Sequence, residues 1–130
     1  MDMDVSGQGG GIADDEALTP LEVLIQLYEG AIRFLEQAVL ACEEGQVDEF
    51  KDLLARGRRI IEEFQRTLDF GQGGSVPAQL NDLYEYMLER LTQAGLTHDS
   101  QYIQDVVTNL RTLLEGWRSL GVGAGADSAP

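Results

Sequence analysis

The sequence predicts an all-α protein, an antiparallel up-down four-helix bundle between a flexible N-terminal arm and a flexible C-terminal tail. Four segments repeat apolar residues at the i, i+3, i+4, i+7 spacing of one helical face, and no segment alternates with a period of two. Capping residues punctuate each segment, and proline is absent from the helix interiors. Because the connections are short, consecutive helices are expected to lie antiparallel.

The first helix is predicted to begin at Thr19-Pro20. Thr19 is a suitable N-cap, Pro20 suits the first helical position, and Glu22 completes a capping box. The helix is expected to run to about Glu44, where Gly45 provides a left-handed stop.

The other three helices follow with their own boundaries. The second is expected from near Asp48 to just before the glycine-rich segment 71–74, and the third from a cap at Ser75 to Gly95. The fourth is expected to begin within residues 97–100 and to end before Gly121. This assigns residues 1–18 to the arm, 19–120 to the bundle and 121–130 to the tail.

Charge limits the classes of partner. The 130-residue chain has room for one domain and carries nine Lys and Arg against 23 Asp and Glu, a formal net charge of −14. Nucleic acids and anionic membranes would repel such a chain. No apolar run is long enough to span a bilayer, and the acidic, glycine-rich N-terminus does not resemble a secretory signal. We therefore expect a cytoplasmic protein.

Few residues are suited to catalysis or to metal binding. A single cysteine, Cys42, and a single histidine, His98, exclude an internal disulfide, a zinc site of nitrogen and sulfur ligands, and a di-iron site built on paired Glu-x-x-His motifs. His98 lies at a helix start, which favours a turn or capping role over phosphotransfer. Cys42 falls on an apolar face and is more typical of a small buried residue than of a nucleophile. No enzyme is expected.

A basic cluster and a glycine-rich segment also have structural explanations. Arg56, Arg58 and Arg59 are spaced to pair with Glu62 and Glu63, although they could also attract an acidic partner. The segment 71–74 lacks the motifs of a phosphate-binding loop and is interpreted as an interhelical connection.

The first helix carries an unusually wide apolar surface. At 100° per residue its apolar arc covers about 200°, whereas a core-facing surface helix typically shows about 100° or somewhat more. The central stripe consists of Leu24, Tyr28, Ala31, Leu35, Ala38 and Cys42, with Leu21, Ile25, Ile32 and Val39 on one side and Val23, Leu27, Phe34 and Ala41 on the other.

Two interpretations of this surface remain open. The helix could be the most buried of the four, with Gly30 allowing a neighbouring helix to approach. Alternatively, one flank could face a groove for a partner helix, with Gly30 admitting the partner's backbone. Three further apolar or aromatic residues fall outside the core stripes. The predicted partner-binding residues are Val23, Leu27, Gly30, Phe34, Tyr86, Tyr102 and Leu113.

Four sequence blocks resemble the flagellar secretion chaperone family, FliS. They are "LYEGAIRFLEQA" (27–38), "RTLDFGQGG" (66–74), "LNDLYEYMLERL" (80–91) and "LRTLLEGWRSL" (110–120). Their order and spacing match the family across about residues 19–120.

The resemblance implies a cytoplasmic export chaperone without catalytic activity or cofactor. Its partner would be the disordered C-terminal segment of flagellin, which it would keep from polymerising prematurely and help deliver to the flagellar type III export machinery, with contact to the export gate. It also implies a protein that is mainly a monomer or weak dimer.

The chain departs from the family in its arm, where an aromatic residue is typical; here only Val5, Ile12 and Leu18 could fill a groove. The competing hypothesis is a non-catalytic helical module that pairs with itself as a homodimer.

Overall fold

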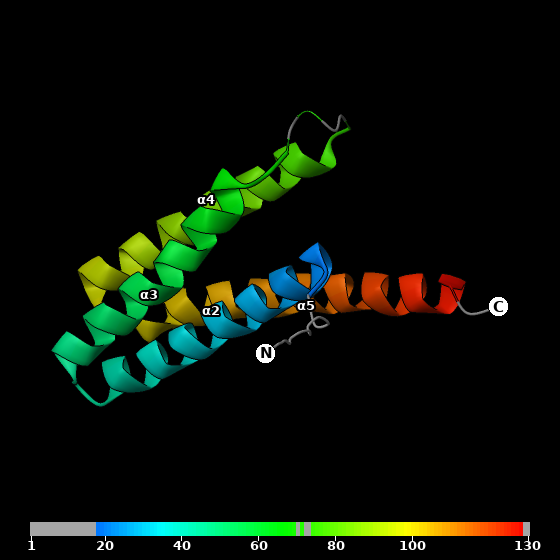
Figure 1. Cartoon of the computed structure of the whole chain (residues 1–130). Coiled ribbons are helices and arrows are strands. Elements are labelled where there is room, and N and C mark those ends of the chain that lie inside the picture. The colour runs from blue at the N-terminus through cyan, green and yellow to red at the C-terminus, as the bar shows by residue number, and fades with distance from the viewer. Residues whose placement is uncertain (1–17, 70, 72–73, 129–130) are drawn as a thin grey trace, which may run out of the picture.

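The computed structural model describes residues 18–69, 71 and 74–128, and side chains as far as residue 121. The described chain forms four helices and no strand: α2 (Pro20–Glu43), α3 (Val47–Arg66), α4 (Val76–Thr97) and α5 (Ser100–Ser128). Figure 1 shows them as successive antiparallel segments. The all-α four-helix bundle predicted from the sequence is confirmed.

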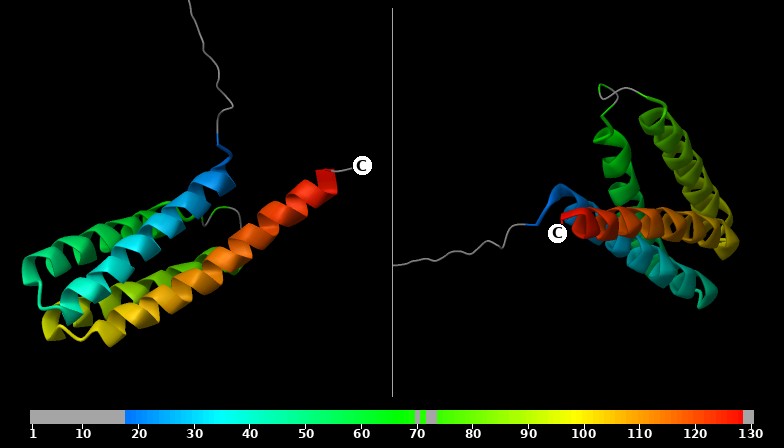
Figure 2. Two further views of the ribbon diagram at one scale, coloured as in Figure 1. Left: turned by 90° about the horizontal axis from the view of Figure 1, so that it is seen from below. Right: turned by 90° about the vertical axis from the view of Figure 1, so that its right-hand side faces the viewer.

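The helices surround the core in chain order. α2 packs mainly against α3 and α5, and α4 packs mainly against the same two helices. The pair α3 and α4 lies at an angle to the pair α2 and α5, and the two pairs separate toward the α3–α4 connection (Figures 1 and 2). The bundle is therefore closed at one end and splayed at the other.

The predicted apolar faces form the core. Each helix contributes fully buried side chains, among them Leu35 from α2, Phe50 from α3, Met87 from α4 and Leu110 from α5. Buried residues in each helix recur at the spacing of one helical face, as the sequence predicts.

A small residue sets the separation of α2 and α3. Gly57 is buried on the apolar face of α3, and a Cβ atom built there would lie 2.5 Å from Leu35 Cδ2 and 2.7 Å from Leu35 Cγ. Two non-bonded carbon atoms do not approach each other so closely in a packed protein interior. The close approach between these two helices therefore depends on Gly57, whereas the sequence suggested Gly30.

The helix starts follow the sequence more closely than the helix ends. The capping box at the start of α2 is present, since Thr19 Oγ1 accepts a hydrogen bond from the Glu22 amide (3.1 Å) and the Glu22 carboxylate accepts one from the Thr19 amide (2.8 Å). Gly45 follows α2 with a φ of 73°, as predicted. Ser75 precedes α4 but makes no side-chain capping bond.

Two predicted helix ends are wrong. α4 passes through Gly95 and ends at Thr97, and His98 takes the left-handed conformation with a φ of 58°. Histidine is among the residues that tolerate this conformation, and the His98 ring also packs edge-on against Phe50, with centroids 5.2 Å apart. His98 thus has the capping role that the sequence suggests.

α5 continues past Gly121 to Ser128 instead of ending before Gly121. A glycine weakens a helix by about 1 kcal/mol without preventing it, and the next proline is Pro130. A Cβ atom at Gly121 would lie 3.5 Å from Leu21 Cδ2, so this turn still lies beside α2. Residues 1–17 of the predicted arm, and 129–130 of the predicted tail, lie outside the described residues.

Candidate functional site

An apolar groove lies at the splayed end of the bundle, between the start of α2 and the end of α3. The groove has a volume of about 460 Å³. Its α2 wall carries Val23 and Leu27, whose side chains are 42% and 36% exposed. The remaining lining residues are Leu18, Pro20, Leu24, Glu63, Phe64 and Thr67. We call this surface the α2/α3 groove.

An aromatic cluster forms the floor of the α2/α3 groove. The Phe64 ring stacks on Tyr28 with centroids 4.4 Å apart, and the Trp117 ring meets Tyr28 edge-on at 6.2 Å. The hydroxyl groups of Tyr28 and Tyr84 form a buried hydrogen bond of 2.6 Å. Each of the four helices contributes one aromatic residue to this cluster, and Phe64 is the one that lines the groove.

The two tyrosine hydroxyls remain protonated at neutral pH. Burial raises the pKa of Tyr28 and of Tyr84 above the usual value for tyrosine. The hydrogen bond between the hydroxyls therefore joins two neutral groups and adds no charge to the floor of the groove.

Gly30 and Phe34 lie farther along α2, where α3 covers them. Gly30 is buried, and a Cβ atom there would lie 3.8 Å from Ile60 of α3 and 3.7 Å from Arg33. Phe34 is half-buried, with the Arg56 guanidinium 5.9 Å from the centre of its ring. These two residues pack against α3, while Val23 and Leu27 line the open groove.

The other predicted residues lie on the α4/α5 side of the bundle. The Arg90 guanidinium lies over the Tyr102 ring at 4.4 Å and the Tyr86 ring at 5.7 Å, and it forms an ion pair with Asp105. The hydrogen bond from Arg90 holds the pKa of Asp105 below its usual value. Leu113 is half-buried on α5 and packs against the core. The seven predicted residues therefore do not come together in one site.

A second groove, which the sequence analysis did not identify, runs along the other flank of α2. It consists of two contiguous hollows of about 670 and 390 Å³ that share Glu36 and Thr108. Its α2 wall carries Glu29, Ile32, Arg33, Glu36, Val39 and Leu40. Its α5 wall includes Val107, Arg111, Leu114, Glu115 and Arg118. We call this surface the α2/α5 groove.

The sequence contained a signal for the α2/α5 groove. Ile32 and Val39 belong to the flank of α2 opposite Val23 and Leu27, so the wide apolar arc borders a groove on each side. Periodicity shows the width of the arc, but the spacing of α3 and α5 decides which parts remain open.

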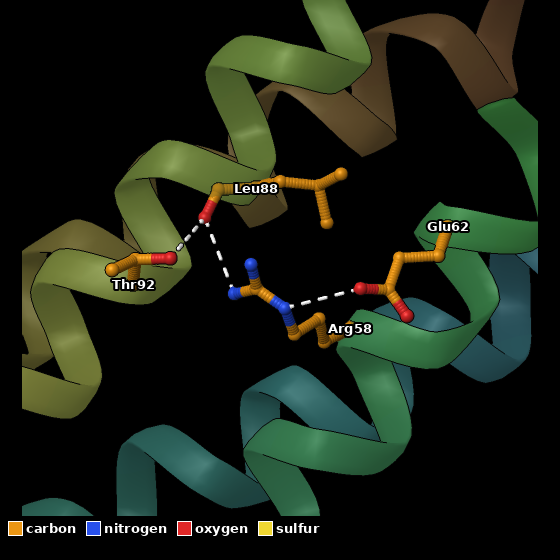
Figure 3. Close-up of polar contacts among 4 residues, drawn as sticks. All are labelled: Arg58, Glu62, Leu88 and Thr92. Carbon is orange, nitrogen blue, oxygen red and sulfur yellow. Dashed lines mark hydrogen bonds and ion pairs between the residues drawn. The ribbon is translucent and has the colours of Figure 1, made fainter.

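The basic cluster of α3 is largely occupied by contacts within the bundle. Arg56 pairs with Asp52, and Arg58 pairs with Glu62 while donating a hydrogen bond to the Leu88 carbonyl of α4 (3.3 Å). Figure 3 shows that this carbonyl also accepts a hydrogen bond from the Thr92 hydroxyl. Of the predicted pairs, Arg58 with Glu62 is confirmed, whereas Arg56 pairs with Asp52 and Glu63 with Arg66. The bond from Arg58 to α4 was not predicted, because it depends on how the helices pack.

Cys42 forms a contact between the end of α2 and the α4–α5 connection. The Cys42 thiol donates a hydrogen bond to the His98 carbonyl at 3.1 Å. Burial, followed by the charges of Glu43 and Asp99, raises the pKa of this thiol, which disfavours the thiolate. Within the described part of the chain, no three acidic, histidine or cysteine side chains form a potential metal site. The described helices also include none long and apolar enough to cross a bilayer.

An open apolar groove between two helices is the kind of surface on which an amphipathic helix of another polypeptide can dock. Comparison with known proteins identifies the family. Residues 13–123 match the family described as flagellar protein FliS. The chain belongs to the FliS family.

Named relatives agree with this assignment. The flagellar secretion chaperone FliS of Salmonella typhimurium is 33% identical over 103 residues, covering 78% of this chain and 76% of that protein. FliS of Campylobacter jejuni is 30% identical over 102 residues, covering 78% and 80%. FliSB of Pseudomonas aeruginosa is 32% identical over 98 residues, covering 75% and 78%. The family places this chain among flagellar export chaperones, a class of binding proteins rather than enzymes.

Proposed function

We propose that this protein binds the disordered C-terminal segment of flagellin in the α2/α3 groove. Binding would keep that segment from polymerising and help deliver the subunit to the flagellar type III export apparatus, with contact to its gate. The protein would act in the cytoplasm, mainly as a monomer or weak dimer. Of the residues predicted from sequence, we assign Val23 and Leu27 to this contact.

The observation that carries the proposal is an open apolar groove on a strongly acidic chain. Val23 and Leu27 expose apolar surface to water at the mouth of a groove where Glu63 is the single charged residue among the described lining residues. Removing apolar surface from water is favourable by about 25 cal/mol per Å². A client segment with an apolar helical face gains this energy when it fills the groove.

The client must be ordered as it binds. Coupled folding and binding typically buries about 1,000–3,000 Å² and costs about 2–5 kcal/mol in ordering. The α2/α3 groove is too small to supply all of that area, so we expect the client to continue over neighbouring surfaces of the bundle. Val23 and Leu27 would anchor one part of a longer contact.

Calorimetric titration with the flagellin C-terminal segment from the same genome tests the proposal. Saturable one-to-one binding with a negative heat-capacity change is expected, since apolar surface is buried. Leu27→Asp should weaken binding about tenfold or more, because a carboxylate would have to lose water in an apolar groove.

Leu40→Asp is the matched control. Leu40 is an exposed leucine of the same helix (58% exposed) and lies outside the α2/α3 groove, so this variant should weaken binding much less than Leu27→Asp does. Both variants should keep the helical signal in circular dichroism. Loss of binding in Leu40→Asp but not in Leu27→Asp would contradict the assignment of the groove.

A self-pairing module would give a different result. Sedimentation would then show a stable dimer of the protein alone, and the flagellin segment would produce no heat of binding. That pair of results would replace the chaperone proposal.

A further inference from the structure

The charges along the α2/α5 groove alternate in sign on both walls. Along α2 the order is Glu29, Arg33, Glu36, and the facing residues of antiparallel α5 are Arg118, Glu115, Arg111. Every position therefore faces the opposite sign across the groove and is followed by the opposite sign along its own helix.

The outer positions of this pattern are paired across the groove, and the middle ones are not. Arg118 pairs with Glu29 at 2.5 Å, and Arg111 pairs with Glu36. Neither Arg33 nor Glu115 has an ion-pair partner among the described residues. Within the part of the chain that the structure describes, the middle of the groove thus presents one unpaired cation, Arg33, and one unpaired anion, Glu115.

The same groove has an apolar end. The smaller hollow is bordered by Val39, Leu40 and Val107, and the Leu40 side chain is 58% exposed. From Leu40 back to Glu29, α2 rises about 16 Å at 1.5 Å per residue, or about three helical turns. A helix of this length could place an apolar residue over Leu40 and charged residues beside the ion pairs.

The charge pattern excludes partners of a single sign. These six residues sum to zero on a chain whose net charge is −14. A polybasic segment would meet three arginines and an acidic segment three glutamates. A helix with both signs interleaved on its flanks would place an acidic residue beside Arg33 and a basic residue beside Glu115. It would also avoid like charges beside the four residues that already pair across the groove.

We propose that the α2/α5 groove is a second docking site, for an amphipathic partner helix with an apolar anchor and interleaved acidic and basic flanks. No lining residue is shared with the α2/α3 groove, so the two grooves are separate surfaces that can be tested one at a time. The proposal does not depend on the identity of the client.

Two synthetic stapled helical peptides of identical composition provide the probe. Both carry a leucine anchor, three lysines and three glutamates. In the interleaved peptide the flank toward α2 reads Lys, Glu, Lys and the flank toward α5 reads Glu, Lys, Glu. In the segregated peptide one flank is all lysine and the other all glutamate. Neither has a net charge that the acidic chain could attract.

The full chain should bind the interleaved peptide about five- to tenfold more tightly, and this preference should shrink as salt is raised. The double variant Arg33→Glu with Glu115→Arg makes the α2 wall wholly acidic and the α5 wall wholly basic. It should therefore reverse the preference in favour of the segregated peptide. The substitutions break no ion pair within the described chain, and circular dichroism checks that the like charges they bring together along each helix leave the helical content unchanged.

Leu40→Asp should weaken both peptides, whereas Leu27→Asp, on the other groove, should affect neither. The proposal would be overturned if neither peptide bound or if both bound equally well. It would also be overturned if the double variant still preferred the interleaved peptide. None of these results would affect the flagellin titration, which tests the α2/α3 groove separately.

Discussion

Substitution of two buried helical glycines by alanine measures how tightly α2 and α3 are held together. Gly57 and Gly30 both lie at the interface of these helices, and both would gain about 1 kcal/mol of helix propensity as alanine. Their surroundings differ. A Cβ atom at Gly57 would lie 2.5 and 2.7 Å from two carbons of Leu35, whereas at Gly30 the nearest atoms are 3.7 and 3.8 Å away.

The overlap at Gly57 is not easily relieved. Leu35 is completely buried, and one of the two contacts involves Cγ, which cannot move without displacing the whole side chain. Overpacking of this kind typically costs about 1–3 kcal/mol. Gly57→Ala should therefore be neutral to destabilising by about 2 kcal/mol, and Gly30→Ala should stabilise by about 0.5–1 kcal/mol.

Comparing the two variants isolates the packing term, because the helix-propensity gain is common to both. In urea unfolding followed by circular dichroism, the free energy of unfolding of Gly57→Ala should be about 1–3 kcal/mol lower than that of Gly30→Ala. If Gly57→Ala proves as stable as Gly30→Ala, the helices can separate at no cost and the argument fails.

The same variants bear on the α2/α3 groove. Because Gly30 is buried beside Ile60, Gly30→Ala should bind the flagellin segment as the unmodified protein does. Weakened binding by this stable variant would support the interpretation that Gly30 admits the partner's backbone.

Two further predictions concern polar contacts within the bundle. Tyr84→Phe should destabilise the fold by about 1–3 kcal/mol because it leaves the buried Tyr28 hydroxyl without its partner. The double variant Tyr28→Phe with Tyr84→Phe should lose less stability than the sum of the two single variants. Additive changes in the free energy of unfolding would contradict this. Asp105 has a lowered pKa in the folded protein, so its ion pair with Arg90 stabilises the fold above the unfolded-state value of 3.8. The stability advantage over Asp105→Asn should therefore be present at neutral pH and vanish as the pH falls through the lowered pKa, and an advantage that persists in strong acid would refute this origin.

Local patterns predict the helices and the core because these depend on neighbouring residues in the chain. Apolar spacing identifies the buried face of each helix, and Thr19 with Glu22 forms the capping box as expected. Helix ends are less certain, because propensity there competes with packing. Gly95 stays helical, and His98 takes the left-handed position while packing against Phe50.

The candidate site depended on distances that sequence does not contain. Gly30 and Gly57 both lie near apolar stripes, and only the packing of Leu35 against α3 shows which glycine is required. Tyr86 and Tyr102 were grouped with Leu27 because each falls outside a core stripe. They instead flank Arg90 on the α4/α5 side, since neighbouring helices decide where such residues meet.

The width of the apolar arc on α2 follows from the way the helix pairs diverge. A bundle helix packed closely on both sides needs only a narrow apolar stripe, because its neighbours cover everything beyond it. Where α3 diverges from α2, Val23 and Leu27 remain open, and along α5 the same helix borders a second groove at Val39 and Leu40. Apolar residues on both flanks would favour association between copies of the chain. A net charge of −14 opposes that association through mutual repulsion, so the acidity of the chain would leave both grooves free for the partners proposed for them.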